Sequence, residues 1–251
     1  LRAKARHKPI EEPRFSHTQD SGIFIDCTRA TQNISWYGEI KLNNQIIKIE
    51  DFKGTRDRSW GLRPIGNKDN KETKSNEAPQ FYWLWTPMNF SNHCIFYHRN
   101  DDSLGKPWNC RAVIDNLERN TRLEISNPEI EINYKKNTRR INNLKIKLDD
   151  TELEFTTGRK FYMQGLGYTH PEWGHGNNHG QLKIGFDIID LDKAETELSK
   201  GLIHNLHIQT LSKIKFKTPK ISNTGQGVIE QLFIGRHKPS EFEGILDRIT
   251  K

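Results

Sequence analysis

The sequence predicts an all-β protein built from antiparallel strands. Apolar residues recur at every second position through most of the chain, and β-branched residues are frequent within these runs. Stripes with the helical spacing i, i+3, i+4, i+7 are almost absent. Successive runs start about eight to twelve residues apart, with Asn, Asp and Gly between them, and this spacing is typical of an antiparallel meander that forms a barrel or a sandwich.

We expect the strands to fall in three groups along the chain. The first group comprises runs at residues 22–28, 34–41, 45–50 and 54–60. The second group comprises runs at 80–88, 93–99, 109–115, 121–126, 128–134, 140–148, 152–157 and 161–168. The third group comprises runs at 182–190, 202–209, 211–217 and 226–235.

The polar segment 66–79 divides the chain into two parts. It lacks apolar periodicity, which is expected of an exposed linker, and an aromatic run at 81–85 begins the next strand soon after it. We therefore assign residues 1–78 to the C-terminal part of a first barrel plus the linker, and residues 79–251 to a second barrel. About four strands are too few to close a barrel, so we expect further strands of the first barrel to precede Leu1.

Composition and charge argue against several classes of function. The net charge is +7 over 251 residues, but Lys and Arg are scattered among acidic residues and no nucleic-acid-binding motif is present, so no nucleic-acid partner is expected. No apolar run is long enough to span a membrane and no signal peptide follows Leu1, so we expect a cytoplasmic protein. The three cysteines lack a CxxC pair, and P-loop and dinucleotide motifs are absent. Neither a cofactor nor a metal is therefore expected.

The segment 53–64 is the densest chemical signal in the chain, because it combines three arginines, one aspartate and one tryptophan within ten residues. In a functional interpretation, burial inside an apolar barrel raises the pKa of Asp57, which acts as a general acid while Trp60 stabilises a developing cation. Arg56 and Arg63 would then contact the ligand. In a structural interpretation, Asp57 forms ion pairs with neighbouring arginines and fixes the end of the strand. Both interpretations stay open at this point.

Two further groups of residues are candidates for a ligand pocket. Alternation in the strand at 80–88 places Trp83 and Trp85 on one face, which gives an aromatic-walled cavity if that face points into the barrel. A loop rich in Gly and Pro combines aromatic rings, imidazoles and a carboxylate in Tyr168, His170, Glu172, Trp173 and His175. Such a mixture suits a metal site, a polar pocket lining or a rigid cap on a barrel. Because its spacing matches no zinc pattern, we expect it to contact a ligand at the cavity mouth without binding a metal.

Four short motifs occur in a characteristic order. Asp57-Arg58-Ser59-Trp60 is followed by the aromatic run at 81–85 with a hairpin at 95–102, then by a Gly- and His-rich block at 165–176, and finally by Gly225-Gln226-Gly227-Val228-Ile229-Glu230. The first, second and last of these motifs, in this order, resemble those of the double-lipocalin proteins grouped with AttH and the carotenoid 1,2-hydratases. With the Gly- and His-rich block included, the chain is more closely similar to an uncharacterised bacterial family related to them.

The resemblance implies antiparallel lipocalin-like barrels in tandem, with the first barrel incomplete in this chain. It also implies a cavity for a hydrophobic or amphipathic small molecule, such as an isoprenoid, steroid or lipid. As an enzyme of the hydratase or isomerase type, the protein would hydrate, cyclise or isomerise that ligand by acid catalysis. Arg56 stands where the hydratase pattern carries an aromatic residue. Two alternatives stay open: a non-catalytic carrier with the same cavity, and a metalloenzyme that uses the histidine loop.

Overall fold

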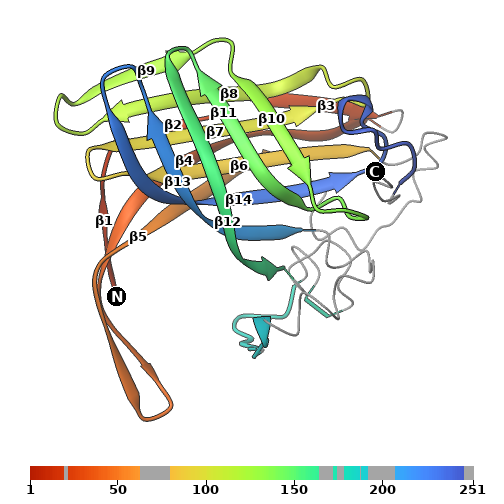
Figure 1. Ribbon diagram of the computed structural model, residues 1–251. Coiled ribbons are helices and arrows are strands. Elements are labelled where there is room, and N and C mark those ends of the chain that lie inside the picture. Colours follow the sequence, from red (N-terminus) through yellow and green to blue (C-terminus); the bar gives the residue numbers. More distant parts are fainter. Residues whose placement is uncertain are drawn as a thin grey trace.

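The structure, a computed structural model, consists of two antiparallel β-sheets (Figure 1). It describes residues 1–19, 22–62, 80–163, 172–173, 178–186, 188–191 and 207–245. The prediction of an all-β fold with antiparallel strands is therefore confirmed. Among these described residues, no helix is long and apolar enough to cross a membrane.

The five-stranded sheet is organised around one long strand. Its members are β1 (Arg2–Ala5), β2 (Ile10–Glu11), β3 (Phe15–Gln19), β4 (Gly22–Leu42) and β5 (Gln45–Leu62). β4 pairs with β1, β2 and β3 at successive positions, and with β5 along its length. The end of the β4–β5 hairpin projects away from the rest of the molecule (Figure 1).

In the five-stranded sheet, two pairs of strands expected from the sequence are single strands in the structure. The runs at 22–28 and 34–41 belong to β4, and those at 45–50 and 54–60 belong to β5. Residues 29–33 of β4 and residues 52–53 of β5 stay paired between the runs, and the register shifts between Trp36 and Gly38, where it skips Glu50 and Asp51 of β5. A long strand tolerates such polar interruptions because its ladder is made by backbone groups. The short strands β1–β3 were missed, since they are too brief for a clear alternation.

The second sheet has nine strands and curls into a barrel-like shape. In chain order they are β6 (Phe81–Asn89), β7 (His93–Asp101), β8 (Pro107–Asn116), β9 (Thr121–Ile125), β10 (Glu129–Tyr134), β11 (Ile141–Leu148), β12 (Thr151–Tyr162), β13 (Ile208–Lys217) and β14 (Ser222–Ile234). Their order in the sheet is β10-β11-β12-β13-β14-β6-β7-β8-β9. The two edge strands, β9 and β10, are joined by the short link 126–128. The edges must therefore approach each other at that end, and the sheet curls to allow it.

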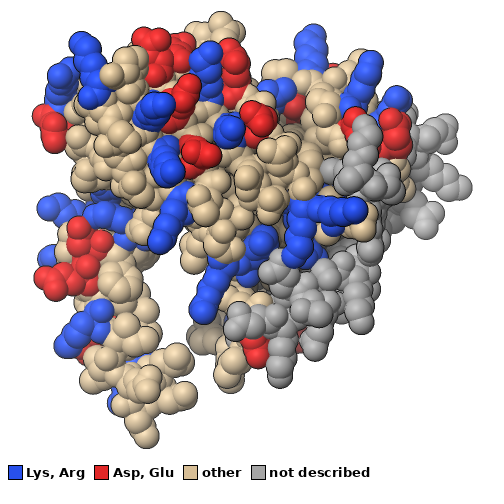
Figure 2. All heavy atoms as spheres, viewed as in Figure 1, with Lys and Arg blue, Asp and Glu red and all other residues tan. Residues whose placement is uncertain are grey.

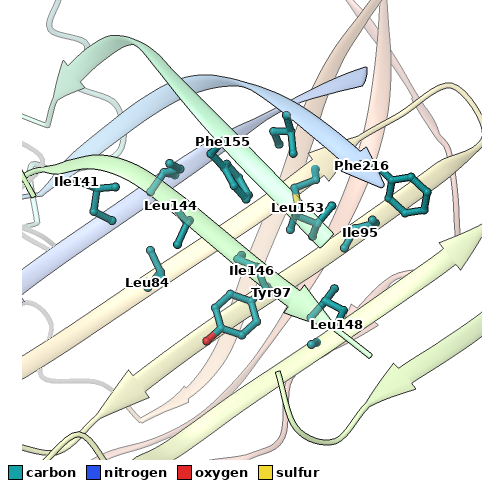
Figure 3. Packing of buried hydrophobic residues seen from close by; sticks show 14 of the residues in the cluster. Leu84, Ile95, Tyr97, Ile141, Leu144, Ile146, Leu148, Leu153, Phe155 and Phe216 are labelled. Carbon is teal, nitrogen blue, oxygen red and sulfur yellow. The ribbon is translucent and has the colours of Figure 1, made fainter. Parts of the chain in front are cut away.

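The interior of this curled sheet is filled by one hydrophobic cluster. Alternate residues of its strands point inward, as the burial pattern of β13 shows. Side chains from strands far apart in the sheet order, such as Leu144 of β11 and Tyr97 of β7, belong to the same cluster (Figure 3). Both are completely buried. The inner face is thus a packed core that stabilises the barrel.

The five-stranded sheet packs on the outer face of the barrel. A second cluster joins Ile10 of β2 to outward-facing residues of the nine-stranded sheet, namely Trp83, Trp85, Phe96, Val113 and Leu232. Hydrogen bonds reinforce the contact: the side-chain amide of Asn33 donates to the Met88 carbonyl at 2.6 Å. The two sheets are therefore joined by both apolar packing and buried polar contacts.

A buried aspartate fixes the N-terminal segment to the barrel. Asp115 of β8 lies 2.7 Å from Nδ1 of His7 and accepts two hydrogen bonds of 2.8 Å from the Arg122 guanidinium. Arg122 also donates to the carbonyls of Lys8 and Pro9. Burial alone would raise the pKa of Asp115, but the hydrogen bonds from Arg122 and His7 lower it to about 2. This clamp holds the chain that leads into β2.

The sequence prediction fails for the run at 182–190. The described part of this run contains no strand, and the alternating Leu182, Ile184, Phe186 and Ile188 are each at least 80% exposed. Alternation gives a segment one apolar face, but it does not supply the neighbouring strand that a sheet requires. Of the expected strand at 161–168, the structure describes residues 161–163, and residues 161 and 162 are the last two residues of β12. The division near residue 78 falls in segment 63–79, outside the described residues, and stays a prediction.

Candidate functional site

The candidate site is a cavity of about 1620 Å³ between the β4–β5 hairpin and the outer face of the nine-stranded sheet. Figure 2 shows the molecule hollowed between the end of this hairpin and the barrel. Strands β6, β12, β13 and β14 supply the barrel side of the wall, and β4 and β5 supply the opposite side. We call this space the intersheet cavity. Its exposed surface is mainly apolar, and about half of the residues that line it are polar or charged.

Strand β6 shows how the sequence places aromatic rings on this wall. Its residues alternate, so Tyr82 and Leu84 enter the barrel core while Trp83 and Trp85 lie on the outer face and line the cavity. The prediction that the two tryptophans share a face is confirmed. Their face, however, points out of the barrel, and the aromatic wall lies between the sheets.

A carboxylate on β14 is the centre of the polar part of the wall. Glu230 Oε1 lies 2.8 Å from Nε2 of His207 and accepts a hydrogen bond of 3.3 Å from the Trp83 indole nitrogen. The side-chain amide of Gln209 donates to Oε2 at 2.7 Å. All four residues line the intersheet cavity. We refer to Glu230, His207, Gln209 and Trp83 as the Glu230 cluster.

The Glu230 cluster keeps its carboxylate ionised. Burial alone would raise the pKa of Glu230, but the hydrogen bond and charge of His207 and the hydrogen bonds from Gln209 and Trp83 lower it below its ordinary value. An ionised carboxylate accepts hydrogen bonds and cannot donate one. Near neutral pH, Glu230 is therefore suited to orienting a donor or stabilising a cation, and poorly suited to giving up a proton.

An ion pair between Arg29, which also lines the cavity, and the buried Glu12 lies against the Trp83 ring. The Arg29 guanidinium stacks over this ring at 3.9 Å and its Nε lies 2.9 Å from Oε1 of Glu12. Burial raises the pKa of Glu12 in spite of this contact. His98 is fully buried beside the pair, and burial, together with the charge of Arg29, lowers its pKa to about 3. Arg29 is thus held between a carboxylate and an indole face, which fixes Trp83 against the wall.

The Gly-x-Gly pair before Glu230 has a packing role. A Cβ atom on Gly227 would lie 2.6 Å from the carbonyl oxygen of Pro87 and 2.8 Å from the Ile214 side chain, and one on Gly225 would clash with the carbonyl of Asn89. Both glycines therefore let β14 lie close to β6. Further along the same two strands, Glu230 of β14 lies opposite Trp85 of β6. The close approach of the strands thus keeps the site residues of β14 and β6 next to each other.

The structure places the arginine-rich segment on β5, and only part of it reaches the cavity. Asp57 lines the intersheet cavity on the hairpin side, where it is exposed, whereas the functional interpretation placed it inside a barrel. Trp60 is 44% exposed and is not among the described lining residues. Arg56 is exposed and donates to the Gln32 side chain at 3.4 Å, also away from the lining. Arg63 lies outside the described residues.

The histidine-rich loop is only partly described. Glu172 forms an ion pair of 2.6 Å with Lys183, whose ammonium group lies 5.2 Å from the centre of the Trp173 ring. The same ring lies 4.7 Å from that of His179, so these residues form a local cluster. Within the described lining of the intersheet cavity, neither Glu172 nor Trp173 is present. Tyr168, His170 and His175 lie outside the described residues.

From the sequence, a metal site in this loop is an alternative, and we expect the loop to bind no metal. Among the residues that the structure describes, no three His, Cys, Asp or Glu side chains are arranged to hold a metal ion. His170 and His175 lie outside this part of the chain. The expectation for the loop itself therefore stays a prediction.

Sequence reasoning did not identify Glu230, His207 or Gln209 as candidate site residues. A signal for each was present: Glu230 ends the Gly-x-Gly-x-x-Glu motif, and alternation places His207 and Gln209 on one face of the adjacent run at 202–209. Their meeting depends on the antiparallel register, in which Gln209 lies opposite Glu230. The sequence contains the residues but not this register.

Comparison with known proteins identifies the family. A family model described as "Family of unknown function (DUF8625)" matches residues 1–243, and a search of curated proteins found no match. Among solved structures, kievitone hydratase from Nectria haematococca aligns with a TM-score of 0.45 and 12% identity, over 88% of this chain and 64% of that protein. A candidate AttH protein from Nitrosomonas europaea aligns with a TM-score of 0.43 and 10% identity, over 82% of this chain and 52% of that protein. The chain belongs to the family of unknown function DUF8625.

Proposed function

We propose that the protein binds a hydrophobic or amphipathic small molecule in the intersheet cavity. The observation that carries the proposal is the wall itself, whose exposed surface is mainly apolar although polar and charged side chains make up about half of the lining residues. Ligand pockets in proteins have this character, because apolar walls supply affinity while a few polar groups fix the orientation. An isoprenoid, a steroid or a lipid chain is the class of molecule that suits such a wall.

The charged groups of the cavity favour an amphipathic ligand. Arg58 and Asp57 of β5 and Lys213 of β13 lie on its walls, together with the Glu230 cluster. A ligand that placed an apolar body against Trp83 and a polar group near one of these charges would satisfy both parts of the lining. A purely apolar ligand would leave several charges facing a low-polarity molecule, at a cost in free energy.

Asp57 is the residue that we propose as the proton donor if the bound ligand is hydrated, cyclised or isomerised. Because Asp57 is exposed in this structure, the role requires the bound ligand to shield its carboxyl group from water. Asp57 lies on the same cavity as Trp83 and Trp85, so a ligand there could meet both an acid and aromatic faces. The same cavity without a proton transfer would serve a carrier. Turnover of an identified ligand separates the two functions.

Displacement of a fluorescent probe tests the binding proposal. The probe is 8-anilino-1-naphthalenesulfonate, and the competitors are farnesol, progesterone and palmitate. We expect at least one competitor to displace the probe from the unaltered protein. Val228→Trp and Leu211→Trp, both on the cavity wall, should weaken probe binding by about tenfold, because an indole fills the space that the probe occupies.

Leu123→Trp is the matched control for both variants. Leu123 is 55% exposed on β9 and lies outside the described cavity lining, so this variant should bind the probe like the unaltered protein. Far-ultraviolet circular dichroism checks that each variant is folded. The proposal is wrong if no competitor displaces the probe, or if both wall variants bind it unchanged.

A further inference from the structure

We propose that His207 and Glu230 form a proton-accepting dyad on the wall of the intersheet cavity. In this arrangement Glu230 fixes the imidazole through Nε2, and His207 offers Nδ1 to an acidic O–H or C–H group of a bound ligand. The inference rests on the proposed function, since the dyad needs a ligand in the cavity. It goes further by naming which residues accept a proton and what kind of group supplies it.

The hydrogen bond to Glu230 determines which ring nitrogen of His207 carries the hydrogen. Nε2 of His207 lies 2.8 Å from Oε1 of Glu230, and an ionised carboxylate only accepts hydrogen bonds. Nε2 must therefore carry the hydrogen. In a neutral imidazole the other ring nitrogen is then an acceptor, so Nδ1 of His207 has its lone pair available.

Both members of the dyad are held in place by further contacts. The backbone carbonyl of His207 accepts a hydrogen bond of 2.9 Å from the amide of Met163, which fixes the residue at the start of β13. Gln209 and Trp83 bind the two oxygens of Glu230. A carboxylate positioned in this way holds a histidine in one tautomer and stabilises the imidazolium ion that forms when the histidine accepts a proton.

The surroundings of the dyad favour proton transfer to a bound ligand. The side chains of His207 and Glu230 are only 19% and 15% exposed, and both line the cavity. The other charged groups on the described lining are Arg29, which is paired with Glu12, and the side chains of Lys53, Asp57, Arg58 and Lys213. A ligand seated against this wall would displace water from the imidazole, and partial desolvation strengthens the electrostatic effect of Glu230.

A structural role for the same pair makes a different prediction. Gln209 and Glu230 face each other in the β13–β14 register, so the pair could serve only to join these strands. In that case loss of His207 would lower stability and leave the proton-transfer properties of the cavity unchanged. A reaction that needs a base and no other catalyst distinguishes the two roles.

The base-catalysed ring opening of 5-nitrobenzisoxazole is such a reaction. Nδ1 of His207 takes the proton from C3, the C–H electron pair forms the nitrile, and the N–O bond breaks to give 2-cyano-4-nitrophenolate. Glu230 stabilises the imidazolium ion, which then returns its proton to the solvent. The atoms and electrons balance without an oxidant, a reductant or a cofactor, and the coloured product is measured directly.

The rate of this ring opening is compared in four proteins: the unaltered chain, His207→Gln, Glu230→Gln and His93→Gln. A glutamine at 207 can still donate to Glu230 but is not a base. We expect His207→Gln to lower kcat/KM by roughly 10²-fold and Glu230→Gln to lower it by about tenfold. His93 is a matched histidine outside the described lining, so His93→Gln should retain the activity.

Binding of 5-nitroindazole, an isostere that lacks the reactive N–O bond, separates the two proposals. It is measured by quenching of tryptophan fluorescence, and we expect equal affinity in the unaltered chain and in His207→Gln. If 5-nitroindazole binds but ring opening does not depend on His207, the dyad is wrong and the binding function stands. If 5-nitroindazole does not bind to an unaltered chain that does bind 8-anilino-1-naphthalenesulfonate, the dyad is wrong and the binding function stands; if neither compound binds, both proposals fail.

Discussion

The two faces of the nine-stranded sheet are built from the same strands but have different roles. On β14, Ile229 enters the packed interior and is fully buried, whereas its neighbours Val228 and Glu230 line the intersheet cavity. The inner face is continuous, closely packed and apolar. The outer face is covered by the five-stranded sheet in one part and borders a cavity in another. Alternation along a strand thus separates the residues that stabilise the barrel from those available for binding.

The two histidine–carboxylate pairs, His237 with Asp101 and His207 with Glu230, also differ in whether they border the intersheet cavity. His237 lies 3.2 Å from Asp101 and 2.8 Å from the Ser240 hydroxyl, a sequence of contacts like that of a catalytic triad. The Ser240 hydroxyl also lies 2.6 Å from the Tyr134 hydroxyl, and the His237 ring stacks on Tyr82 at 3.9 Å. These residues are absent from the described cavity lining. This pair therefore closes the end of the barrel, while His207 and Glu230 border a space that a ligand can enter.

The largest expected effect concerns the inner face. Ile229→Ala should lower the free energy of unfolding by about 2–5 kcal/mol, because it removes buried methyl groups and leaves a cavity in a core that cannot fully collapse. Val228→Ala, at the next position, should cost about 1 kcal/mol or less, since that side chain is only half-buried. Urea denaturation measures both values. Equal losses in the two variants would show that the faces do not differ in this way.

The second prediction concerns the covered part of the outer face. Asp115→Asn should lower stability by about 2 kcal/mol at pH values above about 4, because the pKa of Asp115 falls from 3.8 to about 2 on folding. A lowered pKa gives stability that is complete above the unfolded value and is lost as the pH falls through the folded value. The difference between the two proteins should therefore shrink as the pH falls from about 4 towards about 2. A difference that is independent of pH over this range would contradict the assignment.

The third prediction compares the two histidine–carboxylate pairs. Ser240→Ala removes a buried hydroxyl that serves both His237 and Tyr134, and it should lower stability by about 1–3 kcal/mol. It should leave the ring opening of 5-nitrobenzisoxazole unchanged, since Ser240 is outside the described cavity lining. Thermal unfolding and the kinetic assay are run on the same sample. A loss of activity without a loss of stability would move the reactive site to the end of the barrel.

Local patterns in the sequence predicted the fold class better than they predicted the site. Alternation and turn residues identified most strands, because both are properties of short segments. The direction of the β6 faces was harder to predict, since Tyr82 and Leu84 on one side are as apolar as Trp83 and Trp85 on the other. The exposure of Asp57 depends on where the β4–β5 hairpin lies relative to the barrel. That relation is made by packing between distant segments, and a single sequence does not contain it.

The smallest expected effect tests a residue that was chosen from the sequence as a ligand contact. Glu172 pairs with Lys183, and the two side chains are 53% and 45% exposed. An exposed pair of this kind contributes about 0–1 kcal/mol, so Glu172→Gln should change stability by no more than this amount. Because Glu172 lies outside the described lining of the intersheet cavity, the variant should also bind 8-anilino-1-naphthalenesulfonate with unchanged affinity. Glu230→Gln is the informative comparison, since it changes the same chemical group on the cavity wall. Weakened probe binding in Glu172→Gln alone would place the ligand at the histidine loop and away from the Glu230 cluster.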